Sequence, residues 1–510
     1  MSTILVLNMG MKSIRSILFD EEGSKLAASS LPIETSLKGE TVTQNPAEWW
    51  EKTCMVIKES LSDAGHIPVD YLTVTASSSC LVCVDGKGDA LFPCMMVSDK
   101  RAKEESGTLE RLLSFPKVKK QTGLQADASL MLPKALWMKN REGGIFQRTM
   151  KLLSPNDFLI AKFTGRYATD YMNAHKWYYD AEEKSYPREL LQEAGIPEAM
   201  LPEVLIPGSF VGNIIEEAAE QTGLTIDTKV ILSTYDAICS FVGSGTMQEG
   251  EASDVSGTVT VLRAASSKKM ELTENRIQQI PYYEGGMYII GGSNNMGGGL
   301  IEWVKQCYYQ NEQLPYELME RDAGEASIGA GGVIFLPYLL GERTPIWDSD
   351  ARGVFFGLER MHTRKEMTRA VFESTGFIDL DMIAAIEEAG ITIDSIRLSG
   401  GLARINLISQ LKADITGRKI QVLSEFETTA TGAAMIALYG QNVYSSLQEA
   451  AGRFAKVRMV ICPDMKNHEK YKELYFLYKE TYQTLKPLFP KRIKMTEQLY
   501  RNKRIRIENL

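Results

Sequence analysis

The chain has 510 residues, of which 44% are hydrophobic and 24% charged, and its formal net charge is -8. A length of this order predicts two to four domains of roughly 100–200 residues each, and the composition is that of a globular protein. The acidic balance argues against nucleic acid as the main partner, and no apolar run approaches the roughly 18 residues that a membrane helix needs.

Cysteine usage and the N-terminus predict a cytoplasmic protein. Seven cysteines, an odd number, are scattered from Cys54 to Cys462, which suits reduced thiols rather than a disulfide framework. No basic segment followed by an apolar one opens the chain, so we expect no secretory signal. Cys80 and Cys83 have CxxC spacing without a second pair or a nearby histidine, so no structural zinc site is expected.

Two strand patterns joined by a glycine-containing turn open the chain. Residues 4–7 and 14–19 are apolar strand-like runs, and Gly10 lies in the turn between them. The pattern predicts a β-hairpin or a meander. Such a turn either wraps phosphate groups with its backbone amides or is a plain connection.

Helix starts are marked by capping residues in both halves of the chain. Asn45, Pro46 and Glu48 fit the N-cap, N1 and N3 positions of a helix. Thr363 and Glu366 form a capping box before a second, longer helix pattern. Helix and strand patterns alternate along the chain, which favours an α/β architecture.

The stretch from Val230 to Thr260 combines a carboxylate with a candidate phosphate loop. A strand-like run ends at Asp236, a segment rich in small residues follows, and a second strand pattern opens on Ser256-Gly257-Thr258. Backbone amides and hydroxyls of such a loop can hold phosphate oxygens. The same pattern also fits a core strand end followed by an ordinary turn.

A further nucleotide-contact pattern lies in the C-terminal half. Residues 396–399 form a strand pattern that leads directly into Gly400, Gly401 and a helix ending at Gly417. Glycines admit a close ligand, and a helix start offers free N–H groups and positive dipole. The spacing is not GxGxxG, so a dinucleotide site is not indicated.

Several stretches together resemble the FGGY carbohydrate kinases, which are ATP-dependent sugar and polyol kinases of the actin-like, ribonuclease-H-like superfamily. The resemblance covers residues 3–485 and rests on the order and spacing of the stretches rather than on one of them. They include Asn45-Pro46-Ala47-Glu48-Trp49-Trp50, Asp99-Lys100-Arg101-Ala102, Thr169-Asp170-Tyr171-Met172-Asn173-Ala174, Tyr235-Asp236-Ala237, Gly341-Glu342-Arg343-Thr344-Pro345 and Gly400-Gly401-Leu402-Ala403-Arg404.

The resemblance implies an α/β fold with two ribonuclease-H-like (actin/hexokinase-like ATPase) domains and an active site in the interdomain cleft. Residues 1–250 would form the N-terminal, sugar-binding domain and residues 251–488 the C-terminal, ATP-binding domain. Residues 489–510 would form a basic tail, which we expect to be exposed to solvent. Homodimers are common in the family, although nothing in this sequence itself indicates one.

Carried over by position, Asp236 corresponds to the catalytic aspartate, which orients a hydroxyl of the acceptor and takes its proton. Arg101 fits two roles equally, an ion pair that holds the fold or a contact to the sugar. The resemblance implies sugar contacts at Ser78, Ser79, Asp99, Arg101 and Asp236. It implies ATP contacts at Gly10, Lys12, Ser13, Gly257, Thr258, Gly400, Gly401 and Ala403.

The first turn departs from the family pattern, which usually reads Asp-x-Gly-Thr-Thr-Ser. The aspartate position, which helps to hold Mg²⁺, is Asn8, and a neutral amide is a poorer magnesium partner. The implied metal site is therefore Asn8 together with Asp236. Met11 and Lys12 replace two phosphate-binding threonines, and Lys12 either supplies positive charge to the phosphates or points to solvent.

The sugar strand departs from the pattern as well. Residues 77–80 read Ser-Ser-Ser-Cys where other branches carry larger polar side chains, and Val97 replaces a common tryptophan. Small side chains there would reshape the pocket. Residues 341–358 and 400–410 resemble the xylulokinase–gluconokinase side of the family, which favours a ketopentose such as xylulose or a related polyol.

Two functions follow from these observations. The first is an ATP-dependent carbohydrate kinase that uses ATP and Mg²⁺ to phosphorylate a hydroxyl of a small sugar or polyol. The second is a catalytically impaired protein with the kinase fold that binds sugar or nucleotide, a hypothesis that rests on Asn8, Met11 and the serine run.

Overall fold

The computed structural model describes residues 2–270, 276–282, 287–496 and 499, and its chain divides into two compact units. Unit 1 comprises Met1–Gly245 and Glu427–Ala455, and unit 2 comprises Thr246–Phe426 and Lys456–Leu510. Most of the basic tail predicted from residue 489 onward lies outside the described residues. In the described part of the chain, no helix has the length and apolar character needed to cross a membrane.

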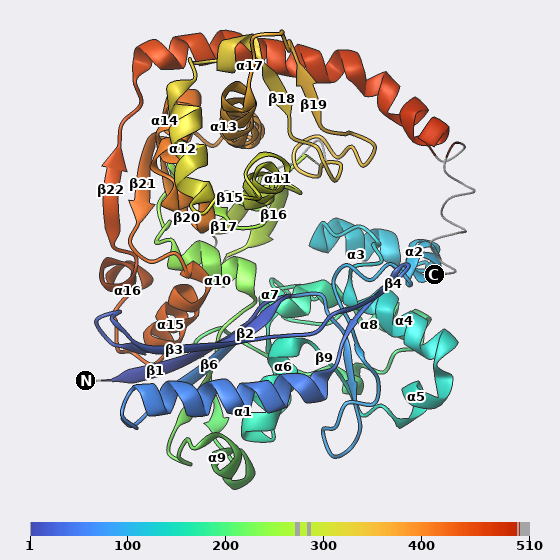
Figure 1. The fold of residues 1–510 in the computed structure, drawn as a ribbon. Coiled ribbons are helices and arrows are strands. Elements are labelled where there is room, and N and C mark those ends of the chain that lie inside the picture. The colour runs from blue at the N-terminus through green and yellow to red at the C-terminus, as the bar shows by residue number, and fades with distance from the viewer. Residues whose placement is uncertain (1, 271–275, 283–286, 497–498, 500–510) are drawn as a thin grey trace. The chain divides into compact units, whose positions relative to one another are not determined.

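The core of unit 1 is a six-stranded sheet in the order β12-β13-β6-β1-β2-β3 (Figure 1). The central strands β1, β6 and β13 run parallel to one another, and β2, β3 and β12 each pair antiparallel with the preceding strand toward the centre, β1, β2 and β13 respectively. The strands are β1 (Thr3–Met9), β2 (Ser13–Asp20), β3 (Lys25–Pro32), β6 (Tyr71–Ala76), β12 (Phe210–Asn213) and β13 (Lys229–Leu232). Shorter strands are β4 (Ser36–Lys38), β5 (Thr41–Gln44), β7 (Val82–Val84), β8 (Cys94–Met95), β9 (Lys151–Leu153), β10 (Ala168–Asp170) and β11 (Glu203–Leu205).

Helix α1 of unit 1 begins where its capping residues predict. Asn45 accepts a hydrogen bond from the backbone N–H of Ala47, and Pro46 is the first helical residue. The helices are α1 (Pro46–Asp63), α2 (Lys103–Glu110), α3 (Phe115–Thr122), α4 (Met131–Arg141), α5 (Gly143–Arg148), α6 (Pro155–Thr164), α7 (Tyr171–Ala174), α8 (Arg188–Ala194), α9 (Glu216–Thr222), α10 (Asp236–Gly243), α15 (Thr428–Gly440) and α16 (Leu447–Phe454).

Unit 2 repeats this arrangement in a seven-stranded sheet, in the order β16-β17-β15-β14-β20-β21-β22. As in unit 1, three central strands, β14, β20 and β21, are parallel, and the outer strands are antiparallel. The strands are β14 (Glu251–Ser256), β15 (Thr260–Ser266), β16 (Gln278–Pro281), β17 (Tyr288–Ser293), β20 (Ser395–Ser399), β21 (Lys419–Leu423) and β22 (Val457–Ile461), with a separate hairpin of β18 (Ile334–Leu336) and β19 (Val354–Phe356). The predicted α/β architecture with two similar cores is confirmed.

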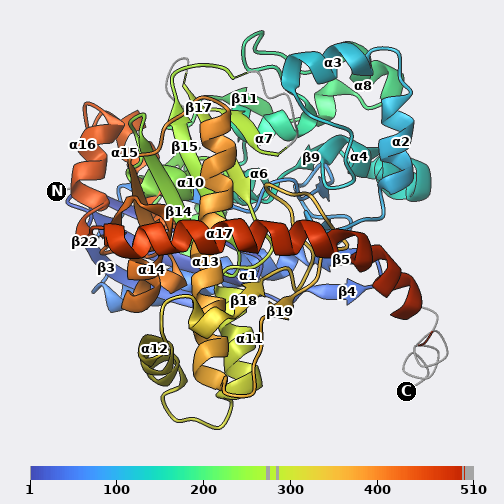
Figure 2. The ribbon, with the colours of Figure 1, turned by 90° about the horizontal axis from the view of Figure 1, so that it is seen from above.

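Long helices cover the sheet of unit 2. Helix α17 lies across α13 (Figure 2), where the hydroxyl of Tyr471 donates to Glu373 at 2.8 Å. The capping box of Thr363 and Glu366 opens α13, as predicted. The helices are α11 (Gly298–Tyr308), α12 (Pro315–Glu325), α13 (Arg364–Glu388), α14 (Asn406–Thr416) and α17 (Met465–Leu485).

The units divide the chain differently from the predicted domains in two places: residues 246–250 belong to unit 2, and the longer segment Glu427–Ala455, which the sequence assigned to the C-terminal domain, packs in unit 1. The reason for the second difference is a close crossing of α15 with α10. A Cβ atom on Gly243 would lie 1.9 Å from the carbonyl oxygen of Thr428, and one on Gly432 would lie 1.8 Å from that of Cys239. Only glycines allow two helix backbones to approach so closely.

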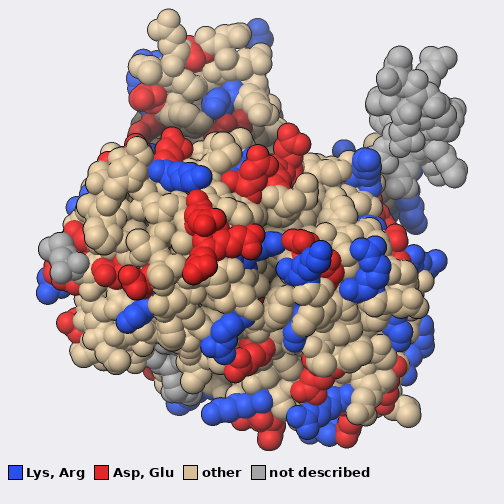
Figure 3. All heavy atoms as spheres, turned by 90° about the horizontal axis from the view of Figure 1, so that it is seen from below, with Lys and Arg blue, Asp and Glu red and all other residues tan. Residues whose placement is uncertain are grey.

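Charges on the surface are mixed. On the face drawn in Figure 3, lysines and arginines alternate with aspartates and glutamates, and no large area carries one sign alone. A nucleic-acid footprint would require a basic stripe, and this face has none.

Candidate active site

Asp236 opens helix α10 of unit 1. The strand predicted to end at Asp236 ends earlier, at Leu232. Side-chain hydrogen bonds replace the strand ladder in between, because the hydroxyl of Ser233 donates to a carbonyl of β6 at 2.6 Å and the amide of Asn156 donates to the carbonyl of Thr234 at 3.2 Å. These bonds turn the chain out of the sheet and into the helix.

The carboxylate of Asp236 is held at both oxygens. Ser77 donates from its hydroxyl to Oδ2 at 3.0 Å, and the backbone N–H of Ala237 donates to Oδ1 at 2.7 Å. The first turn of a helix also favours negative charge. Asp236 itself is only partly buried. A carboxylate oriented in this way can hold a substrate hydroxyl and accept its proton.

A second carboxylate supports the same loop from inside. Asp170 accepts a hydrogen bond from the hydroxyl of Thr234 at 2.8 Å and caps helix α7 through the backbone N–H groups of Met172 and Asn173. Burial raises the pKa of Asp170 to about 6, and the hydrogen bonds from Thr234 and Asn173 act to lower it. Asp170 is therefore a support for Thr234, two residues before Asp236.

The serine run forms the turn between β6 and β7. Ser78 is half-buried, and Ser79 is buried with a left-handed backbone conformation, φ = 60°. The ammonium of Lys134, which sequence reasoning missed, donates to the carbonyl of Ser79 at 2.5 Å. The available signal was a lysine between Pro133 and Ala135 in an otherwise apolar helix start.

Asp99 and Arg101 form a buried ion pair. Asp99 is fully buried, and it accepts from the guanidinium of Arg101 at 2.9 Å and from the backbone N–H of Val42 at 2.9 Å. The guanidinium carbon of Arg101 also lies 4.6 Å from the ring centroid of Trp137. Of the two roles left open for Arg101, the ion pair that holds the fold is present. Contact with a sugar stays a prediction for both residues.

The first turn is a regular hairpin connection. The backbone N–H of Gly10 donates to the carbonyl of Ser13 at 3.0 Å, the hydroxyl of Ser13 accepts from Arg15, and the side chain of Lys12 is exposed. Asn8, near the end of β1, is 7% exposed, and its side-chain amide has no hydrogen-bond partner among the described residues.

The metal site that the resemblance implies offers one carboxylate and one amide oxygen, those of Asp236 and Asn8. In the described ranges there is no group of three or more histidine, cysteine, aspartate or glutamate side chains that could hold a metal. This donor set does not suit an all-protein metal cage. It fits Mg²⁺ that keeps several waters and binds mainly to substrate phosphates.

The candidate phosphate loop of unit 2 joins β14 to β15. Gly257 and Thr258 are exposed there, and their carbonyls accept hydrogen bonds from the start of α11. Gly298 donates to Gly257 at 2.7 Å, and Gly297 donates to Thr258 at 2.8 Å. A Cβ atom on Gly298 would lie 2.8 Å from the carbonyl oxygen of Gly257, so the loop and the helix start pack backbone to backbone.

The second predicted nucleotide segment lies beside this loop. Gly400 follows β20 with φ = 84°, and a Cβ atom on it would lie 2.5 Å from the carbonyl oxygen of Ser256. Gly401 is exposed, and Ala403 is buried with its carbonyl accepting from Arg458 at 3.3 Å. Unit 2 therefore brings the two predicted ATP segments, 257–258 and 400–403, next to each other.

A buried ion cluster lies under the phosphate loop. The ammonium of Lys412 contacts Asp254 at 2.5 Å and Asp379 at 2.6 Å, and the side chains of all three residues are fully buried. The same ammonium is 3.3 Å from the hydroxyl of Ser256. The cluster joins β14, α13 and α14 and so fixes the strand end from which the loop begins.

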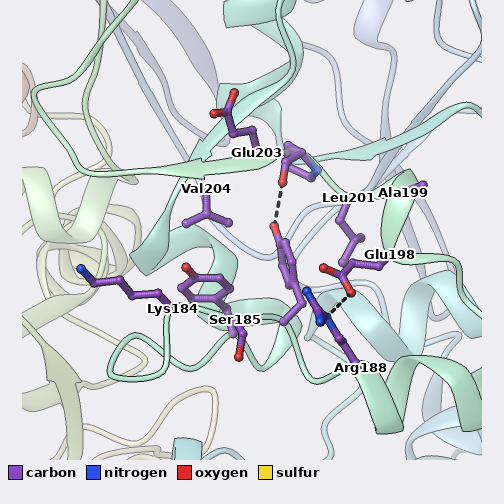
Figure 4. A pocket seen from close by; sticks show the side chains of 11 residues that line it. Lys184, Ser185, Arg188, Glu198, Ala199, Leu201, Glu203 and Val204 are labelled. Atoms are coloured by element: carbon purple, nitrogen blue, oxygen red, sulfur yellow. Dashed lines mark hydrogen bonds and ion pairs between the residues drawn. The ribbon is translucent and has the colours of Figure 1, made fainter.

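A surface pocket of about 440 Å³ lies elsewhere in unit 1 (Figure 4). None of its lining residues is a predicted site residue, and several are already paired: Tyr186 donates to the carbonyl of Pro202 at 3.1 Å, and Arg188 contacts Glu198 at 3.0 Å. The pocket has no part in the candidate active site.

Known proteins resemble this chain over nearly its whole length. It is 27% identical over 498 residues to the xylulose kinase of Bacillus subtilis (strain 168), covering 96% of this chain and 98% of that protein. A gluconokinase of the same organism is 24% identical, covering 86% of this chain and 87% of that protein. The crystal structure of ligand-bound xylulose kinase from Lactobacillus acidophilus has a TM-score of 0.88 at 25% identity and covers 96% of this chain and 100% of that one.

Two protein-family models match the chain. The N-terminal domain model of the FGGY family of carbohydrate kinases matches residues 3–243, and the C-terminal domain model matches residues 253–440. The matching solved kinases also confirm the predicted actin/hexokinase-like ATPase fold. This chain therefore belongs to the FGGY family of carbohydrate kinases, which are ATP-dependent sugar kinases.

Proposed function

We propose that the protein transfers the γ-phosphate of ATP to a hydroxyl of a ketopentose such as xylulose, and that Asp236 takes the proton of that hydroxyl. The observation that carries the proposal is the carboxylate of Asp236, which Ser77 and Ala237 hold at its two oxygens. Phosphoryl transfer needs a base that orients the attacking hydroxyl. Two similar proteins named xylulose kinase support a ketopentose as the acceptor.

The acceptor would bind in the N-terminal part, residues 1–250, and ATP in the C-terminal part, residues 251–488. The proposed acceptor contacts are Ser78, Ser79, Asp99, Arg101 and Asp236. The proposed ATP contacts are Gly257, Thr258, Gly400, Gly401 and Ala403, with Gly10, Lys12 and Ser13 at the phosphates. Backbone amides in these loops would stabilise the charge that develops on the transferring phosphoryl group.

Magnesium belongs to the proposal as the partner of ATP. When bound to the phosphates it neutralises their charge during transfer. The amide oxygen of Asn8 and the carboxylate of Asp236 would lie near its water ligands. Since Asn8 is neutral, the ion would depend more on the nucleotide than on the protein.

The test measures ADP release with ATP and a panel of ketoses, aldoses, polyols and sugar acids. We expect the highest kcat/KM for a ketopentose, and we expect Asp236→Asn to lower kcat by about 10²- to 10⁴-fold. The matched control is Asp227→Asn, an exposed aspartate just before the other end of β13. A kcat of Asp236→Asn within about tenfold of the wild type would contradict the proposed base, and sugar binding without any turnover in the wild type would favour a non-catalytic binding protein.

A further inference from the structure

Lys134 is a fully buried lysine whose ammonium donates to three backbone oxygens. It donates to the carbonyls of Ser79 at 2.5 Å, Met96 at 2.8 Å and Ser129 at 3.0 Å. Across the part of the chain that the structure describes, no carboxylate lies within 4.0 Å of its nitrogen. A buried ammonium is costly unless its donors are satisfied, and here three carbonyls from separate segments satisfy them.

Those carbonyls belong to segments that surround the serine turn. Ser79 lies in the turn between β6 and β7, and Met96 follows β8. Ser79 has φ = 60°, a conformation that residues other than glycine adopt only when their surroundings hold them there. The hydrogen bond from Lys134 to Ser79 supplies such a constraint from helix α4.

The same turn reaches Asp236. Ser77 is two residues before Ser79, and its hydroxyl donates to Oδ2 of Asp236 at 3.0 Å, across 159 positions of sequence. The other oxygen accepts from the backbone of α10 itself. Rotation of the carboxylate about its last bond would break the contact with Ser77, so the position of this hydroxyl sets the direction in which Asp236 presents its lone pairs.

We propose that Ser77 and Lys134 are positioning residues for phosphoryl transfer: the buried ammonium fixes the turn at Ser79, and the hydroxyl of Ser77 in that turn fixes the carboxylate of Asp236. This inference rests on the proposed role of Asp236 as the base. Neither residue needs to touch ATP or the acceptor. Loss of either should therefore reduce the chemical step more than the binding of ATP.

The test compares kcat with the KM values of single variants. Ser77→Ala is expected to lower kcat about 10- to 100-fold, because it removes one hydrogen bond to a charged group, and to leave the KM for ATP within about twofold. Ser77→Thr keeps the hydroxyl and should recover kcat to within about threefold of the wild type. A role in packing alone would not be rescued by the hydroxyl of threonine.

Lys134→Met tests the other end of the connection. Its matched control is Lys139→Met on the same helix, because the ammonium of Lys139 donates to a backbone carbonyl as well, that of Ala194 at 2.8 Å, away from the serine turn. We expect Lys134→Met to lower kcat and Lys139→Met to leave it unchanged. In the double variant Ser77→Ala/Lys134→Met, the loss should be close to that of Ser77→Ala alone, since both changes act through one contact.

Two outcomes separate this inference from the proposed function. If Asp236→Asn lowers kcat by about 10²-fold or more while Ser77→Ala keeps kcat within about twofold of the wild type, the positioning role is wrong and the base remains. If Asp236→Asn keeps kcat within about tenfold of the wild type, the proposed function itself fails. Losses of Ser77→Ala and Lys134→Met that simply multiply in the double variant would overturn the connection between them. Lys134→Met does not decide the matter if it unfolds, because the Ser77 variants then carry the test.

Discussion

At the scale of single residues, the absence of a side chain at Gly400 allows the close backbone packing beside the proposed ATP-binding loop. Its φ of 84° is a backbone conformation that favours glycine, and a Cβ atom would lie 2.5 Å from the carbonyl oxygen of Ser256. Gly400→Ala must therefore push the end of β14 and the loop at Gly257 out of place. We expect a higher KM for ATP, by about tenfold or more, with little change in the KM for the acceptor.

A glycine outside the proposed ATP contacts provides the control for this prediction. A Cβ atom on Gly324 in α12 would lie 3.9 Å from a side-chain carbon of Leu407, an ordinary contact, and its φ is not positive. Gly324→Ala should therefore leave the loop at Gly257 undisturbed. Steady-state kinetics with ATP varied at saturating acceptor distinguish the two. Equal KM values for both variants would show that the close approach at Gly400 does not control the loop.

At this scale, the sequence identifies a functional side chain only where the residues next to it in the chain form a recognisable pattern. The apolar run before Asp236 and the small residues after it made this carboxylate a candidate, and the resemblance to the FGGY kinases implied its catalytic role. Ser77 and Lys134 were not predicted, because their contacts join positions 159 and 55 residues apart. No local pattern encodes which serine of three donates to a distant carboxylate, and the apolar neighbours of Lys134 indicate burial without showing which carbonyls its ammonium contacts.

At the scale of elements, the buried cluster of Lys412, Asp254 and Asp379 joins a strand to two helices. Lys412→Met would leave two fully buried carboxylates without their cation. Burial and the neighbouring Asp254 already raise the pKa of Asp379 well above its usual range. We expect the variant to lose about 3–5 kcal/mol of unfolding free energy, the cost of breaking a buried pair on one side, measured by urea titration.

The surrounding helices offer a matched comparison for that loss. Lys365 on α13 pairs with Glu325 in an exposed ion pair, and Lys365→Met should cost less than about 1 kcal/mol. Adding Asp379→Asn to Lys412→Met should recover part of the stability, because it removes one of the two unpaired charges. A cost for Lys412→Met no larger than that for Lys365→Met would mean that the cluster contributes little to the fold.

The sequence predicted the boundaries of helices correctly where a side chain accepts a hydrogen bond from the free N–H groups at the helix start. The starts of α1 and α13 lie where Asn45 and Thr363 predicted them, because their side chains accept hydrogen bonds from first-turn N–H groups. The end of β13 was not predicted correctly. An apolar run gives no sign that Ser233 and Thr234 form hydrogen bonds with other elements instead of a neighbouring strand.

At the scale of the whole chain, unit 1 is made from two segments separated by most of unit 2. The alternating strand and helix patterns predicted an α/β architecture, and the resemblance to the FGGY kinases implied two domains of similar core. It did not predict that Glu427–Ala455 returns to unit 1. That return depends on the close fit of Gly243 and Gly432 across two helices, and small residues at helical spacing fit many partners equally well.

Because Glu427–Ala455 belongs to unit 1, we predict different effects for two truncations of the chain. A chain ending at Phe426 lacks α15 and α16, whereas one ending at Ala455 has all of unit 1, and both lack the same residues of unit 2 from Lys456 onward. Helix α15 packs on β1 and β6 as well as on α10, and its apolar side chains, among them Ala433, Met435 and Ile436, are fully buried.

Without α15, that side of the sheet is exposed to water, so the amides of β1 and β6 should exchange rapidly with deuterium in the shorter chain and slowly in the longer one. The shorter chain should also bind a hydrophobic dye. Slow exchange of β1 in both chains would show that the first segment folds without the second, and that α15 is only an added layer on a core already complete at Gly245.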